Sequence, residues 1–220
     1  MYPVYGVKVN VDTAQVASPL VPLVGYETGV HLGAPDDVLQ VSIAAWALNI
    51  DSELIFVGDA GTTEDTAVGS ARHGIELSSA WQFNPQLRWE LEYSNSRAAL
   101  DEAIDGRRTI AGSLRHTILN EFLFTPTDRW SASLRVRYFS SYPLDDGAWA
   151  PASQLVNARL HYAAEHWQLR LDLLNLLNSD DHDIEYFYAS SLQGESMPYE
   201  DHHYHVFEPR SVRITWRYTP

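Results

Sequence analysis

The last fourteen residues of the chain, Phe207–Pro220, read FEPRSVRITWRYTP and alternate between apolar and polar side chains. Successive side chains of an extended strand point to opposite faces. One face would hold Val212, Ile214, Trp216 and Tyr218, and the other would hold Ser211, Arg213, Thr215 and Arg217. If the apolar face packed in a soluble core, the arginines would face water. If it faced lipid, the arginines would line a lumen, so the choice between these two geometries decides the fold.

The same alternation recurs along most of the chain. Clear examples are IELSSAWQF, LRWELEYS, WSASLRVRY and WQLRLDLL. A period of two is the signature of strands with two chemically different faces. It predicts strands over residues 26–32, 38–57, 72–83, 87–96, 113–124, 129–139, 154–162, 167–177 and 211–218, with a further strand over 4–11. The chain is therefore predicted to be all-β, with about nine or ten strands.

The connections between these strands alternate in length. Short turns rich in Pro, Asn, Asp and Gly are predicted at GAPDD, NPQ, TPTD and AAEH. Long loops are predicted at 58–71, 97–112, 140–153 and 178–209, with a short helical turn in SRAALDEAIDG inside the second of them. Short turns at one end and long loops at the other are typical of an antiparallel up-and-down membrane barrel.

Aromatic residues are sorted by their position along the strands. Those beside a short turn or the C-terminus are Trp81, Phe83, Trp89, Phe122, Phe124, Trp130, Tyr162, Trp167, Trp216 and Tyr218. Those where strands enter long loops are Tyr93, Tyr138, Phe139 and Tyr142. Two belts of aromatic residues that flank an aliphatic band are typical of the membrane interfaces of a transmembrane β-barrel. The opposite face would then line the lumen, with Arg88, Glu90, Glu92, Arg135, Arg137, Arg170, Asp172, Arg213 and Arg217.

Composition excludes several classes of protein. The net charge of −14 over 220 residues argues against a nucleic-acid partner, which would need a basic surface. No apolar run reaches the roughly 18 residues of a transmembrane helix, and MYPVYGVKVN has neither the basic nor the apolar region of a signal peptide. The absence of cysteine excludes disulfides. There is no Gly-x-Ser-x-Gly, P-loop or His-Glu-x-x-His motif, so we expect no enzyme and no cofactor.

Two groups of loop residues are candidates for ligand chemistry. The stretch YEDHHYH places Asp201, His202, His203 and His205 close together, and imidazole and carboxylate are ligands of transition metals. The alternative is a solvated polar loop, because the spacing matches no established metal motif. The long loops are also acidic, through Asp59, Glu64, Asp65, Asp101, Glu102, Asp105, Asp145, Asp146, Asp180, Asp181 and Asp183. They could attract cations, or simply keep the loops soluble.

The sequence resembles the C-terminal part of a TonB-dependent outer-membrane receptor. The resemblance rests on GYETGVHL, SELIFVGDAGTTEDT, ARHGIELSSAWQF, LRLDLLNLLN and EPRSVRITWRY, which together span most of the chain from Gly25 onward. It implies that residues 1–220 are a section of a larger barrel of about 22 strands, without its plug domain. The chain ends on Tyr218, Thr219 and Pro220, whereas members of the family usually end on an aromatic residue.

The resemblance also implies a function and a location. The family takes up siderophores, metal complexes or other scarce nutrients across the outer membrane, with energy from the TonB complex. Its partners would be outer-membrane lipid and lipopolysaccharide, the remaining plug and strands of the same receptor, and a small ligand. The long loops would be extracellular and the C-terminus periplasmic. A soluble or periplasmic β-sandwich and a small passive barrel are the alternatives.

Overall fold

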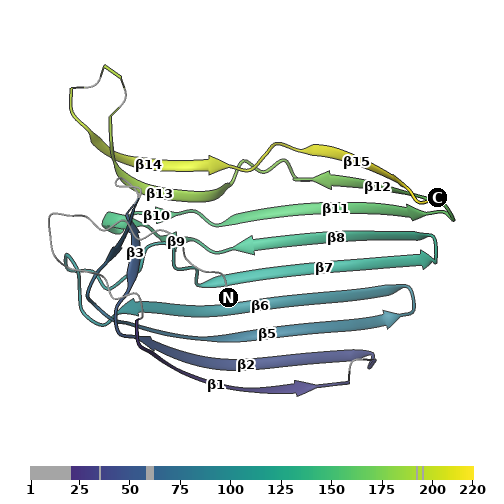
Figure 1. Cartoon of the computed structure of the whole chain (residues 1–220), viewed down its shortest axis with the longest axis horizontal. Coiled ribbons are helices and arrows are strands. Elements are labelled where there is room, and N and C mark those ends of the chain that lie inside the picture. The colour runs from purple at the N-terminus through teal and green to yellow at the C-terminus, as the bar shows by residue number, and fades with distance from the viewer. Residues whose placement is uncertain (1–20, 35, 58–61, 192, 195) are drawn as a thin grey trace.

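The computed structural model describes residues 21–220 except 35, 58–61, 192 and 195. Nine strands form one antiparallel sheet in the order β1-β2-β5-β6-β7-β8-β11-β12-β15 (Figure 1). The strands are β1 (Leu23–Leu32), β2 (Leu39–Ile50), β5 (Ser70–Asn84), β6 (Leu87–Leu100), β7 (His116–Thr127), β8 (Trp130–Phe139), β11 (Ser153–Ala163), β12 (Trp167–Leu174) and β15 (Ser211–Tyr218). Each of the nine strands predicted between residues 26 and 218 corresponds to a strand of this sheet, with differences in bounds given below, and the one over 4–11 lies outside the described residues.

Short and long connections alternate as predicted. The turns β1–β2, β5–β6, β7–β8 and β11–β12 lie at one end of the sheet, to the right in Figure 1, and the longer connections lie at the other. We call these the turn end and the loop end. The sheet is not closed, because β1 pairs only with β2 and β15 only with β12 among the described strands.

The helical turn predicted in SRAALDEAIDG is wrong. Strand β6 instead runs on to Leu100, which lies opposite Ser70 of β5. The chain then reverses through Asp105 and Gly106, both at positive φ, and closes a bridge between Ile104 and Arg107. Pairing with β5, together with the hydrogen bond from the Leu100 N–H to the Arg108 carbonyl at 2.8 Å, outweighs the helix propensity of the alanines.

The strand predicted over 167–177 ends three residues earlier, at Leu174. Asn175 has a φ of 49° and is 2% exposed. Its side-chain amide donates to the carbonyls of Ser179 at 2.7 Å and Glu208 at 2.9 Å, and its Oδ1 accepts the Ser179 N–H at 2.9 Å. Asparagine tolerates this left-handed conformation and caps the turn with its own side chain, which stops the strand.

Three small hairpin sheets lie at the loop end. They are β3 (Leu54–Val57) with β4 (Thr62–Asp65), β9 (Tyr142–Pro143) with β10 (Trp149–Ala150), and β13 (His182–Ser190) with β14 (Tyr199–Val206). The strand predicted over 38–57 is therefore two strands, β2 and β3, and the segment predicted as loop 178–209 contains a hairpin. A one-turn 3-10 helix, η1 (Asp145–Gly147), joins β9 to β10. Among the described residues, no helix has the length and apolar character to cross a membrane.

Candidate lumen wall and loop-end clusters

The cross-strand register sorts the side chains of the sheet onto two faces. Directly opposed residues lie on the same face, and such pairs link Glu92 to Leu119, Leu119 to Arg137, and Arg137 to Leu155. Further pairs link Arg159 to Asp172 and Asp172 to Arg213. All nine residues predicted to line a lumen lie on this polar face: Arg88, Glu90, Glu92, Arg135, Arg137, Arg170, Asp172, Arg213 and Arg217.

Charge on the polar face is unevenly distributed by sign, although Arg72 and Arg88 of the first strands pair with Glu53 and Glu90. Its acidic residues on β1 to β7 are Glu27, Glu76, Glu90, Glu92 and Glu121. Its basic residues on β8 to β15 are Arg135, Arg137, Arg159, Arg170, Arg213 and Arg217. The two groups meet where Arg135 Nη2 lies 2.7 Å from Glu121 Oε2. The lumen residues predicted from the sequence include five of these six arginines but not Arg159, and they do not include Glu27, Glu76 or Glu121.

Asp172 is the one acidic residue of the basic half, and it is 4% exposed. Arg159 Nε donates to its Oδ1 at 2.6 Å, and Arg170 Nε lies 3.0 Å from its Oδ2. Burying a carboxylate is costly unless it is paired and hydrogen-bonded. Asp172 therefore joins β12 to β11 through the Arg159 guanidinium, and Arg170 of its own strand adds a second positive charge.

Two hollows lie on the polar face. A hollow of about 380 Å³ has Glu27, Glu76 and Glu92 in its lining. A second hollow of about 240 Å³ lies between Glu90, Glu121 and Arg135. Carboxylates therefore line both hollows of the polar face.

All seven residues predicted for the aromatic belt lie on the opposite face, near the turn end: Trp81, Phe83, Trp89, Trp130, Trp167, Trp216 and Tyr218. Trp81 contacts Phe83 with ring centroids 4.4 Å apart, and Trp130 and Trp167 both pack on Tyr162. The indole of Trp89 donates to Asn120 Oδ1 at 3.0 Å, so its polar atom needs no water. Aliphatic side chains of the same face, including Val30, Ile75 and Ile214, are exposed.

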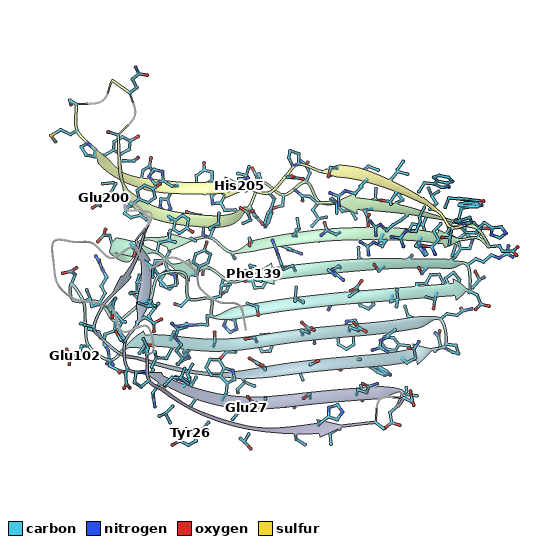
Figure 2. All side chains as sticks on the ribbon, viewed as in Figure 1. Tyr26, Glu27, Glu102, Phe139, Glu200 and His205 are labelled. Atoms are coloured by element: carbon cyan, nitrogen blue, oxygen red, sulfur yellow. The ribbon has the colours of Figure 1, made fainter. Side chains whose placement is uncertain are left out.

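The second belt of aromatic residues, at the loop end, contains fewer of the predicted residues than expected. Tyr93 and Tyr138 lie on the apolar face, opposite Ile118 of β7 on its two sides. Phe139, labelled in Figure 2, lies opposite Thr117 and Ser153 on the polar face, with the Arg137 guanidinium 4.9 Å from its ring centroid. Tyr142 belongs to β9 rather than to the sheet. Phe139 and Tyr142 therefore do not belong to the predicted belt, and the exposed Tyr26 of β1 is an additional member.

The β13–β14 hairpin is organised around a buried carboxylate that the sequence analysis missed. Glu185 is 4% exposed, and its two oxygens lie 2.5 Å from His182 Nδ1 and 2.5 Å from His202 Nδ1. The His182 ring stacks on Tyr204 at 3.8 Å. Burial, together with the negative charge of Glu185, raises the pKa of the Tyr142 hydroxyl. The run IEYFY, rich in residues that favour strands, was the available signal for this hairpin.

The structure separates one of the four residues predicted to bind a metal from the other three. Asp201, His203 and His205 lie on one face of the hairpin, opposite Tyr188, Tyr186 and Ile184, whereas His202 lies on the other face with Glu185. His205 pairs with Asp183 at 2.9 Å, and His203 stacks on Tyr188 at 3.9 Å. Within the described part of the chain, no group of three His, Cys, Asp or Glu residues is arranged to hold a metal ion. Metal binding by this stretch stays a prediction.

Several of the acidic loop residues are tied into the loops. Asp146 lies 3.3 Å from Arg107, and Asp181 accepts the Gln154 N–H at 2.8 Å. Asp65 accepts hydrogen bonds from Ser52 Oγ and from the Ala67 N–H, the latter at 2.9 Å, which lower the pKa of its carboxyl. Asp59 lies outside the described residues. Glu53, also missed from the sequence, is buried beside β5 and accepts hydrogen bonds from Ser70 and Arg72.

A continuous antiparallel sheet with one charged face and one aromatic-bordered apolar face matches a known family. The family model described as "TonB dependent receptor-like, beta-barrel" covers residues 24–176. The chain belongs to this family. A search of curated proteins finds no match to this TonB-dependent receptor barrel chain.

Solved structures with the same fold are receptors of this family. The ferric-yersiniabactin uptake receptor of Yersinia pestis matches with a TM-score of 0.69 at 18% identity, over 89% of this chain and 29% of its own. The pyoverdine receptor of Pseudomonas aeruginosa matches with a TM-score of 0.65 at 13% identity, over 88% and 29%. The ferric-catecholate import receptor of Escherichia coli gives 0.64 at 20% identity, over 87% and 26%. The TonB-dependent receptor chain thus spans less than a third of these proteins.

Proposed function

We propose that this chain forms part of the barrel wall of an outer-membrane receptor that takes up a scarce ligand with energy from the TonB complex. One observation carries the proposal. Across nine paired strands, an exposed apolar face bordered by Trp and Tyr lies directly behind a charged, hollowed face. An apolar band with aromatic borders suits lipid, and a charged inner face suits an aqueous lumen.

The soluble sandwich is disfavoured by the same face. A sandwich buries its apolar face against a second sheet about 10 Å away. Among the described residues, the other sheets are three two-stranded hairpins at the loop end, and the apolar face of the nine-stranded sheet is uncovered. Ile214 is 68% exposed and Trp216 is 63% exposed. Burial of these side chains away from water requires lipid, or a partner surface of comparable area.

The small passive barrel is disfavoured by the sheet edges. Strands β1 and β15 each keep one side unpaired among the described residues. Unpaired backbone groups in hydrocarbon cost several kcal/mol each, so a membrane sheet must close. We propose that further strands of the same receptor fill the gap, and that its plug domain faces the charged wall. The short turns would be periplasmic and the long loops extracellular, as in other bacterial barrels.

The ligand class is proposed from the family. The similar structures are named as receptors for ferric yersiniabactin, pyoverdine and ferric catecholates. For this chain we propose a siderophore, another metal complex or a nutrient of similar size. The acidic half of the wall favours complexes that carry exposed cationic groups over strongly anionic ones, because Glu27, Glu76 and Glu92 surround one of its hollows.

An uptake assay tests this proposal. Cells that produce the receptor containing this chain are given a panel of radiolabelled ferric siderophores and cobalamin, with and without a functional TonB complex. We expect accumulation of at least one ligand, its loss without TonB, and its decrease when Leu134→Arg destabilises the receptor in the membrane. Accumulation that is independent of TonB, or a receptor that fractionates as a detergent-free soluble protein, would contradict the proposal.

A further inference from the structure

A pocket of about 360 Å³ lies at the loop end, where the connections that follow β2, β6 and β8 meet the β13–β14 hairpin. Its interior is apolar. Leu100 and Leu144 of its lining are 2% and 5% exposed, and Ile55 of β3 and Phe187 of β13 also line it. A cavity of this size holds a small molecule, or one arm of a larger ligand.

The charged residues of this pocket are mostly acidic. They are Asp105, Asp145, Asp146, Glu200 and Arg107, so the lining holds four carboxylates and one guanidinium. The guanidinium is already paired, because Arg107 Nη1 lies 3.3 Å from Asp146 Oδ1. Asp105 and Glu200 are exposed, and neither carboxylate forms an ion pair or a hydrogen bond within the described ranges of the chain. These two carboxylates are therefore available to a cation from outside.

The pocket is placed above the acidic part of the polar face. Leu100 of its lining lies opposite Ser70 of β5, and Ser70 shares its face with Glu76, six residues further along the strand. Six residues of extended strand span about 20 Å. Glu76 lines the hollow that also holds Glu27 and Glu92. Carboxylates thus continue from the pocket at the loop end to the middle of the sheet.

An apolar interior with unpaired carboxylates at its edge selects one kind of ligand group. An anionic group would be repelled, because the carboxylates outnumber the single guanidinium. A neutral apolar group would fill the interior but would leave the carboxylates without a partner. An ammonium or guanidinium group on an apolar arm fits both parts, since the arm leaves water while the charge stays at the edge. Figure 2 shows Glu200 on the hairpin at the loop end, where a ligand from outside would arrive.

We propose that this pocket selects ligands that carry a cationic group on an aliphatic or aromatic arm. The inference rests on the proposed function and names the charge and shape of the ligand arm that the receptor recognises. The arm packs on Leu144 and Phe187, and its ammonium or guanidinium group pairs with Asp105 and Glu200. Asp105 and Glu200 are therefore specificity-determining residues, and the acidic part of the wall receives the same cation next.

Fluorine NMR of three matched peptides, titrated with the receptor in a nonionic detergent, tests the proposal. The probes are N-acetyl-4-fluorophenylalanyl-lysine amide and the same peptide with glutamine or glutamate in place of lysine, so they differ only in charge. The test variant is Asp105→Asn with Glu200→Gln, and Asn tolerates the φ of 51° at position 105. The control is Glu102→Gln with Asp180→Asn, which removes the same charge from exposed positions outside the lining.

We expect the lysine peptide to bind the parent most tightly, the glutamine peptide at least about threefold more weakly, and the glutamate peptide most weakly. The test variant should bind the lysine and glutamine peptides equally, because the charges that distinguish them are gone. The control variant should keep the preference of the parent, and added salt should reduce that preference. Failure of the lysine peptide to bind, equal binding of all three peptides by the parent, or an unchanged preference in the test variant would overturn the proposal.

The proposed function fails in a different way from this selectivity. The same receptor preparations come from cells in which insertion and TonB-dependent uptake are measured separately. A parent receptor that transports a ligand but does not distinguish the three peptides overturns only the selectivity of the pocket. A parent receptor that is absent from the outer membrane, or that shows no TonB-dependent uptake, overturns the function and with it the role of the pocket in uptake.

Discussion

The sheet and the loop end of this molecule are stabilised in opposite ways. Apart from Val156, the buried apolar residues lie at the loop end or in the segments next to it: Leu100, Ile110, Leu144, Ala150 and Phe207. The long sheet has extensive backbone pairing but leaves its large apolar side chains exposed, including Tyr26 at 72%. Among the described residues, the loop end thus has a small apolar core, whereas the sheet buries few apolar side chains of its own.

The difference teaches where each region obtains its stability. Apolar burial stabilises a fold by about 25 cal/mol per Å² removed from water, and the loop end obtains this from its own side chains. The sheet can obtain it only from something outside the described residues, which we propose is lipid. Buried carboxylates occur in both regions, Glu53 and Glu185 at the loop end and Asp172 in the sheet. Substitutions in each region should therefore have separable effects.

The largest expected effect is on the apolar face of the sheet. Leu134 is exposed in mid-strand on that face, and its neighbour Ser133 lies on the polar face. Leu134→Arg should destabilise the receptor in a bilayer by about 2 to 4 kcal/mol, whereas Ser133→Arg should change the unfolding free energy little. Leu171→Arg, also on the apolar face, is a second test. Urea unfolding in vesicles measures the difference, and equal costs at Leu134 and Ser133 would refute the assignment of the faces.

A smaller effect is expected inside the wall. Asp172→Asn removes the carboxylate that pairs with Arg159 and Arg170, and leaves two guanidinium groups without their partner. Because both arginines are partly exposed, we expect a loss of about 1 to 3 kcal/mol rather than the full cost of a buried charge. Glu92→Gln is the matched control, since the Glu92 carboxylate forms no ion pair among the described residues. The same vesicle unfolding experiment applies, and equal losses for the two variants would show that Asp172 has no special role.

The next effect belongs to the loop end and should leave the sheet unchanged. Glu185→Gln keeps the shape of the side chain but removes the charge between His182 and His202. We expect the β13–β14 hairpin to open more readily, by about 1 to 2 kcal/mol, and to be cleaved correspondingly faster by an added protease. Asp183→Asn, at an exposed pair with His205, is the control and should change cleavage little. A drop in the stability of the whole sheet would contradict the separation of the two regions.

The sequence was sufficient for the sheet because one simple rule operates there. A residue such as Trp81 or Arg135 has its face decided by its position in a period of two, and pairing preserves that decision across all nine strands. The belt and the lumen residues could therefore be assigned to faces from alternation alone. The strand ends were less predictable, because they depend on single residues such as Asn175. Its side chain donates a hydrogen bond to the carbonyl of Glu208, 33 residues away in the sequence.

The loop end could not be predicted in the same way. Its clusters join residues that are distant in sequence, as Glu185 does with His202 and Glu53 does with Arg72. Local density of histidine suggested that His202, His203 and His205 act together, but the hairpin register places them on two faces. Only a prediction of strands β13 and β14 would have revealed this division.

The smallest expected effect concerns the turn between β4 and β5, and it depends on pH. Hydrogen bonds from Ser52 and from the Ala67 N–H lower the pKa of the Asp65 carboxyl. Because the pKa is lowered in the folded state, the ionised carboxylate stabilises this turn at pH values above the unfolded-state pKa of the Asp65 carboxyl, which is about 4. That stabilisation is lost as the pH falls from about 4 through the lower folded pKa.

Hydrogen exchange of the segment from Ser52 to Val68 measures this effect between about pH 5 and pH 3, with rates corrected for the intrinsic pH dependence of exchange. Protection of the Ala67 amide should decrease across that range, because a protonated Asp65 is a weaker acceptor. Asp65→Asn should show the reduced protection at every pH, since its amide cannot ionise. Protection in the sheet, for example at β6, should not change over the same range. Protection of Ala67 that is independent of pH, or identical in Asp65→Asn, would show that the Asp65 carboxylate does not hold the turn.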